Sequence, residues 1–232
     1  MITQVTIAGL RCQLYLPKEY ENCSERYPVI YVNGEIAIEE ILEELKQREI
    51  SPEFLMLSIK PHNWNDDFTP WSAPAFREGE QAPLGKADEY IQKLSGEIKL
   101  YIDANYRTKK EPENSILIGY SLGGLAALYT LYKTDTFGKV GSLSGSLWYD
   151  DWIHFMKNNI FEIRSCKVYL SLGKKESRSR NTRMSKVAEC TEKATEILKE
   201  QLGSKNVTFE WNNGGHFTEI PRRFANAIAW LL

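Results

Sequence analysis

The chain has 232 residues, of which 42% are hydrophobic and 26% are charged, and its formal net charge is −2. These values fit one globular domain over residues 1–232 and give no reason to expect a nucleic-acid partner. No apolar run is long enough to span a membrane, no signal peptide opens the chain, and the four cysteines lack metal-ligand spacing, so we expect a cytoplasmic protein.

Strand-like and helix-like segments alternate along the first half of the chain, which predicts a largely parallel sheet covered by helices. An antiparallel hairpin opens the chain. Two continuous apolar runs, of the kind that is buried on both faces of a sheet, enclose an amphipathic helix. A longer helix then leads to the central strand. In chain order these segments are 5–7 and 12–16, 29–32, 36–48, 54–59 and 86–105.

The central strand, 115–118, runs into the segment 119–123, Gly-Tyr-Ser-Leu-Gly, and a helix of small residues follows at once. This strand–turn–helix context is the one that a nucleophile elbow requires, with the serine Oγ exposed at the top of a sharp turn. The two glycines leave room for the strand and the helix to cross. Ser121 is therefore the candidate nucleophile, and the amide of Leu122 is a candidate donor to a developing oxyanion.

Three more strands and two helices follow, which makes eight strands with the nucleophile after the fifth. This is the layout of the α/β-hydrolase fold. About 22 residues separate the sixth and seventh strands, room for one helix but for no cap domain. A long Pro-rich stretch, 60–85, should border an open site. The later strands are 140–143, 167–172 and 207–211, and the helices are 182–202 and a last one capped by Thr218.

A serine is a poor nucleophile at neutral pH and needs a positioned base. The chain has three histidines. His62 lies in the long Pro-rich stretch and His154 in an aromatic helix. His216 lies in a Gly-rich loop between the last strand and the last helix, so both chain order and loop position favour it as the base.

The base needs a carboxylate to orient it, and this fold usually carries that acid in the loop after the seventh strand. Glu176 is the one carboxylate of the loop 173–180. Asp150 and Asp151, after the sixth strand, are rival candidates, and a Ser–His dyad without an acid is a further alternative.

Backbone amides and aromatic side chains complete the expected site. The turn after the third strand contains Gly34, where a glycine permits close backbone approach, and we expect it to supply the second oxyanion donor beside Leu122. Aromatic side chains near the carboxyl ends of strands are candidates for a substrate wall. They are Trp64, Trp71, Trp148 and Tyr149.

Several segments resemble the "Putative esterase" branch of the α/β hydrolases, and within it the trilactone siderophore esterases of the enterochelin-esterase type. They are 119–125 (GYSLGGL), 144–148 (SGSLW), 173–176 (GKKE), 214–217 (GGHF) and 67–70 (DFTP). The resemblance implies serine ester hydrolysis by Ser121 and His216, with Glu176 as the acid. The chain departs from that family at Asn33, where an aspartate is common, and it lacks the usual arginine just before 67–70.

We therefore expect a serine esterase in which Ser121 attacks the ester, His216 transfers the proton and Glu176 orients the imidazole, with no metal or organic cofactor. The expected small-molecule substrate is a bulky aryl or catecholate ester, such as a siderophore trilactone. Alternatives are a carbohydrate acyl esterase (acetyl or feruloyl), an acyltransferase and, from another class, an inactive hydrolase-fold binding module. The oligomeric state stays open.

Overall fold

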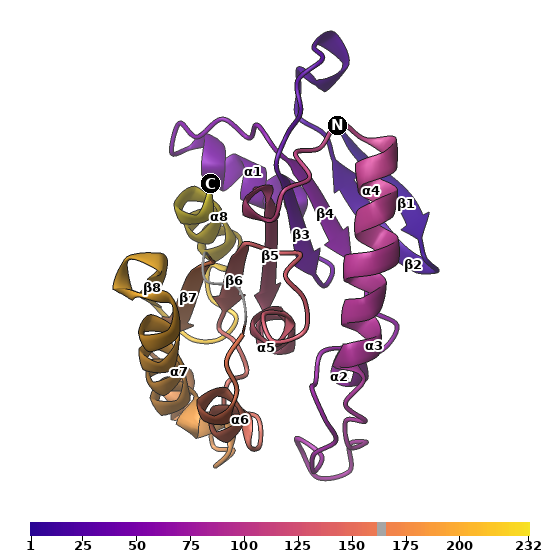
Figure 1. The fold of residues 1–232 in the computed structure, drawn as a ribbon. Coiled ribbons are helices and arrows are strands. Elements are labelled where there is room, and N and C mark those ends of the chain that lie inside the picture. The colour runs from indigo at the N-terminus through magenta and orange to yellow at the C-terminus, as the bar shows by residue number, and fades with distance from the viewer. Residues whose placement is uncertain (162–165) are drawn as a thin grey trace.

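One eight-stranded sheet organises the computed structural model, which describes residues 1–161 and 166–232 (Figure 1). The strand order is β1-β2-β4-β3-β5-β6-β7-β8. β3 to β8 are parallel, whereas the β1–β2 hairpin is antiparallel and joins β4 in antiparallel register. This confirms the predicted, mostly parallel sheet. The strands are β1 (Ile2–Ile7), β2 (Leu10–Tyr15), β3 (Val29–Asn33), β4 (Leu55–Ile59), β5 (Ser115–Tyr120), β6 (Lys139–Leu143), β7 (Lys167–Gly173) and β8 (Val207–Asn212).

Helices cover both faces of the sheet, and each face has its own apolar core. On one face lie α1 (Ile38–Lys46) and α8 (Ile220–Leu231), which contact each other. In Figure 1 these two helices lie together, and α4 and α7 flank the sheet at opposite ends. The second face carries α3 (Ala87–Gln92), α4 (Lys99–Asn105), α5 (Leu122–Thr130), α6 (Trp152–Asn158) and α7 (Val187–Leu202).

Burial explains why the central segments are apolar throughout. Every residue of β3, β4 and β5 is buried, because helices cover these strands on both sides. Every residue of α5 is buried too, which accounts for its small and apolar composition. By contrast α1 is amphipathic and buries one stripe, formed by Ile38, Ile41 and Leu45.

Three predicted helices differ in detail. The helix 86–105 contains a π-helical segment, Lys93–Ile98, between α3 and α4. The helix expected from residue 182 begins at Val187, because the Asn181 side chain accepts two backbone amides and closes a separate turn before it. Thr218 does not cap α8: its hydroxyl accepts the Gly215 amide at 3.1 Å, and Glu219 holds the cap position.

Loops at the carboxyl ends of the parallel strands carry the remaining elements. The Pro-rich stretch 60–85 contains one short helix, α2 (Trp64–Asp67). Among the described residues between β6 and β7, α6 is the one α-helix, as the length of that connection predicts.

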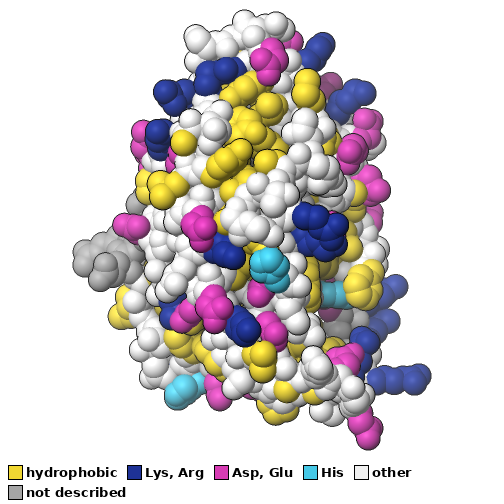
Figure 2. Space-filling view, turned by 90° about the vertical axis from the view of Figure 1, so that its right-hand side faces the viewer, with side chains coloured by type: hydrophobic (Ala, Val, Ile, Leu, Met, Phe, Trp, Pro, Cys, Tyr) yellow, Lys and Arg dark blue, Asp and Glu magenta, His cyan; other side chains and the backbone are white. Residues whose placement is uncertain are grey.

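The surface mixes both signs of charge. Figure 2 shows a face on which acidic and basic side chains are interspersed around a band of hydrophobic ones. Among residues 1–161 and 166–232, no helix combines the length and the hydropathy that crossing a membrane requires.

Candidate active site

Ser121 occupies a sharp turn between β5 and α5, with φ 57° and ψ −123°. A positive φ is strained for a residue with a side chain, and such strain is typical of a nucleophile elbow. Backbone hydrogen bonds hold the turn from the neighbouring strand. The Ser121 amide donates to the Leu143 carbonyl at 3.0 Å, and the Ser121 carbonyl accepts the Ser146 amide at 3.0 Å.

Small residues let the strand and the helix cross at this turn. A Cβ on Gly119 would lie 2.0 Å from the Gly123 carbonyl oxygen, a contact that real side chains do not make. The Asn33 amide nitrogen donates to that same oxygen at 3.0 Å, and the Tyr90 hydroxyl donates to the Asn33 oxygen at 2.9 Å. An ionised aspartate has no donor for the Gly123 carbonyl, so this contact explains an asparagine at position 33.

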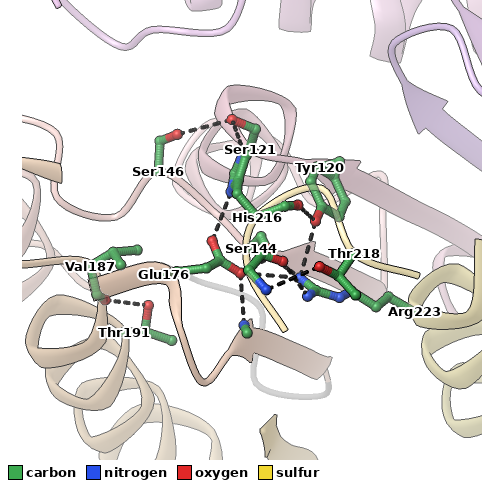
Figure 3. Close-up of polar contacts among 12 residues, drawn as sticks. Tyr120, Ser121, Ser144, Ser146, Glu176, Val187, Thr191, His216, Thr218 and Arg223 are labelled. Atoms are coloured by element: carbon green, nitrogen blue, oxygen red, sulfur yellow. Dashed lines mark hydrogen bonds and ion pairs between the residues drawn. The ribbon is translucent and has the colours of Figure 1, made fainter. Parts of the chain in front are cut away.

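His216 brings its ring to the serine from the loop between β8 and α8 (Figure 3). Its Nε2 lies 3.1 Å from the Ser121 Oγ, a distance that suits proton transfer. The Tyr120 hydroxyl donates to the His216 carbonyl and holds the loop against β5. On the other side of the serine, the Ser146 Oγ lies 3.4 Å from the Ser121 Oγ.

Glu176 accepts hydrogen bonds on both carboxylate oxygens, and its side chain is 4% exposed. Oε2 lies 2.7 Å from the His216 Nδ1. Oε1 accepts from the Ser144 hydroxyl at 2.6 Å, from the Gly173 amide at 2.7 Å and from Arg223 at 3.1 Å. Burial raises the pKa of the Glu176 carboxyl, but the hydrogen bonds from His216, Ser144 and Gly173 outweigh burial and hold that pKa below its usual value.

Arg223 is a buried cation of α8 that joins Glu176 to the loop carrying His216. One guanidinium nitrogen donates to the Glu176 carboxylate and to the Tyr120 hydroxyl. The other donates to the carbonyls of Gly215, at 2.8 Å, and of Asn213. The planar fork of arginine suits this double task, which a lysine could not perform in the same way.

The two amides predicted as oxyanion donors differ in their hydrogen bonding. Leu122 begins α5, so its amide has no acceptor within the helix and adjoins the nucleophile. The Gly34 amide, however, donates to the Ile59 carbonyl at 2.9 Å and is already used within the sheet. Glu35 follows, and among the described residues its amide has no backbone acceptor. The turn after β3 thus leaves the Glu35 amide, and not the Gly34 amide, without a backbone acceptor.

Comparison with known proteins agrees with this geometry. Residues 7–223 match the model of the Esterase family, described as "Putative esterase". The chain belongs to this family. It is accordingly a carboxylic ester hydrolase.

Similar proteins cover almost the whole esterase chain. The protein YbbA of Bacillus subtilis (strain 168) is 28% identical over 229 residues, which span 95% of this chain and 92% of the relative. An IroE-like serine hydrolase from Shewanella oneidensis has a TM-score of 0.79 at 18% identity, over 98% of this chain and 79% of that one. The siderophore hydrolase EstA from Aspergillus nidulans has a TM-score of 0.75 at 17% identity, over 100% of this chain and 93% of that one. These two structures show that the esterase has the α/β-hydrolase fold.

The rival acids and bases lie elsewhere in the esterase. Asp150 forms an ion pair with Arg183, and Asp151 is an exposed residue at the start of α6. His62 is exposed, and the exposed His154 contacts Asn158 within α6.

Two of the four predicted aromatic side chains face the site. Trp64 lines a cavity of about 640 Å³, and Trp148 lines one of about 320 Å³; both cavities include Ser121 and His216. The other two line neither cavity, contrary to the expectation for them. Tyr149 is buried and Trp71 is partly buried, because both rings pack in an aromatic cluster in which Trp71 contacts Tyr149 and Trp152.

Sequence reasoning misses the residues that hold the acid. Ser144 stands out only as part of the segment 144–148, and nothing in the spacing links it to Glu176. Arg223 follows another arginine in the last helix, and nothing in the sequence distinguishes the buried Arg223 from the exposed Arg222. The elbow and the histidine loop, in contrast, have local signals.

Replacing Gly119 by alanine should destabilise the esterase strongly. The new Cβ would meet the Gly123 carbonyl, which is backbone and cannot rotate away. We expect a loss of about 2–3 kcal/mol in the free energy of unfolding, measured by urea denaturation. Gly96→Ala is the control, because a Cβ at that position would have no atom within 4 Å. A Gly119→Ala protein as stable as Gly96→Ala would contradict this account of the elbow.

Acid should destabilise the esterase partly through Glu176, whose pKa lies below its usual value of 4.5. Since the unfolded chain binds this proton more readily, the carboxylate contributes stability that is complete above the unfolded-state pKa and is lost as the pH falls through the folded-state pKa. We expect the free energy of unfolding to fall more steeply between about pH 5 and 3 in the wild type than in Glu176→Gln. Equal slopes of the free energy of unfolding against pH in the two proteins would refute this expectation. Glu200→Gln, on the exposed side of α7, is the control for the removal of a negative charge.

Replacing Arg223 by methionine should lower kcat more than it raises KM. The variant loses both the ion pair with Glu176 and the bonds to the loop carbonyls, so the imidazole loses its fixed position. We expect kcat to fall by about 10- to 100-fold, with Arg223→Lys in between. Arg222→Met is the matched control, since the Arg222 side chain is 58% exposed. Similar kcat values for the Arg222 and Arg223 variants would argue against the positioning role.

Proposed function

We propose that this protein is a serine esterase that forms an acyl-enzyme on Ser121. The observation that carries the proposal is the hydrogen-bonded series from the Glu176 carboxylate through the His216 ring to the Ser121 Oγ, with separations of 2.7 Å and 3.1 Å. A serine, a base and a buried acid in this order and at these distances are the requirements for activating a hydroxyl nucleophile.

The reaction follows from the placement of these groups. The Ser121 Oγ attacks the ester carbonyl carbon while its proton passes to the His216 Nε2. The negative charge that develops on the carbonyl oxygen is stabilised by the amides of Leu122 and Glu35. The ionised Glu176 beside Nδ1 stabilises the imidazolium, which then protonates the departing alcohol oxygen. Water repeats the sequence on the acyl-enzyme and releases the acid.

We further propose that the substrate is a bulky aryl ester, with catecholate trilactones of the siderophore type as the leading class. Cavities on both sides of the nucleophile leave room for two large arms, and Trp64 and Trp148 offer aromatic surface to them. The structural similarity to EstA, a siderophore hydrolase, and to an IroE-like hydrolase supports this choice. The intact Glu176–His216–Ser121 series argues against a binding module that has lost catalysis.

Labelling with a fluorophosphonate and a panel of esters test this proposal together. The panel contains p-nitrophenyl acyl esters, feruloyl esters, and catecholate trilactones with and without iron. The wild type should be labelled and active, whereas Ser121→Ala should lose the label and about 10⁴- to 10⁶-fold in kcat. The comparison variant is Ser146→Ala, which removes the hydroxyl 3.4 Å from the Ser121 Oγ and should keep the label. Undiminished turnover by Ser121→Ala would end the proposal.

A further inference from the structure

The larger of the two cavities at the nucleophile is an apolar groove between the start of α1 and the start of α8. Its volume is about 640 Å³, and it includes Ser121 and His216. We call it the α1–α8 groove and define it by Ile36, Ala37, Ile41, Ile220, Pro221 and Phe224. Phe217, 84% exposed, lines both this groove and the smaller cavity, so an aromatic ring stands where the two meet.

The lysines, arginines and carboxylates that line the groove are of one sign, because only glutamates are among them. Glu35, Glu40 and Glu219 line it, and among the described residues no lysine or arginine does. Lys60 pairs with Glu35 at 2.7 Å and Arg222 pairs with Glu219 at 3.3 Å, so the two nearby cations are already engaged. The rim therefore offers no free positive charge to an anionic ligand.

The smaller cavity, on the other side of the nucleophile, has a different character. Its volume is about 320 Å³. Its lining combines polar and apolar side chains. Besides Ser121, His216 and Phe217 they are Arg77, Ser144, Ser146, Trp148, Glu176, Ser179, Met184 and Val187. Both cavities are therefore largely apolar; the smaller one adds hydroxyl groups and Arg77, which pairs with Glu80 at 3.8 Å, whereas the charged side chains of the groove are acidic.

Resting on the proposed esterase function, we propose that the α1–α8 groove binds an uncharged, apolar arm of the ester, alkyl or aryl, while the other arm lies in the smaller cavity. Each methylene buried in the groove leaves water for apolar surroundings and strengthens binding. A carboxylate placed in the groove would lose its hydration and find no cation there. Uncharged iron-free aryl arms fit the groove, whereas an anionic ferric catecholate does not.

Two ester series test the proposal, because either arm of a substrate could enter the groove. One series varies the acyl chain from acetyl to octanoyl on p-nitrophenol, and the other varies the alcohol from methyl to octyl on benzoate. We expect kcat/KM to rise in one series, by up to about fourfold per methylene. In that series an arm of the same length ending in a carboxylate should react at least about tenfold more slowly.

Ala37→Trp fills the groove from an exposed position, and Glu43→Trp adds the same side chain to α1 outside it. The first variant should abolish the rise with chain length, and the second should keep both the rise and the turnover of the shortest ester. No chain-length dependence in either series, or a rise that survives Ala37→Trp, would overturn the assignment of the groove. The esterase function itself would fail separately, through loss of turnover of every ester or through activity that survives Ser121→Ala.

Discussion

The site depends on the hydrogen bonds of the Glu176 carboxylate, whose two oxygens have different partners. One oxygen is committed to the His216 ring, and the other is held by Arg223, Ser144 and the Gly173 amide. A buried carboxylate is stable only when its charge and its lone pairs are satisfied, and here three donors anchor the oxygen that does not touch the imidazole. These hydrogen bonds fix the orientation of the Glu176 carboxylate before a substrate binds.

Parallel register brings these groups together from distant parts of the chain. β5, β6, β7 and β8 are consecutive neighbours in the sheet, so their carboxyl ends meet at one edge. Ser121, Ser144, Glu176 and His216 each follow one of these four strands. Arg223 then closes the arrangement from α8, because its guanidinium reaches both the acid and the histidine loop. Arg223 thus connects the loop after β7 with the loop after β8.

Local signals account for what can be predicted from the sequence. The elbow at Ser121 needs glycines at fixed positions, and the base needs a loop that follows the last strand, so both leave a pattern along the chain. No sequence pattern distinguishes Gly34 from Glu35 as a candidate oxyanion donor. The difference between them arises because the Ile59 carbonyl accepts the hydrogen bond of one of the two amides. Arg223 and Glu176 are 47 positions apart in the sequence, and a contact over such a separation produces no periodic pattern from which it could be predicted.

The Pro-rich stretch 60–85 shows how a residue that does not face the substrate can still shape the site. The sequence predicts Trp71 in the substrate wall, yet its ring packs among Tyr129, Trp152 and other aromatic side chains, and its indole donates to the Asp150 carbonyl at 3.0 Å. This anchor holds the middle of the stretch, while Trp64 before it lines the α1–α8 groove and Arg77 after it lines the smaller cavity. One segment fixed at its centre therefore contributes a side chain to each of the two cavities that include Ser121 and His216: an indole to the groove and a guanidinium, paired with Glu80 at 3.8 Å, to the smaller cavity.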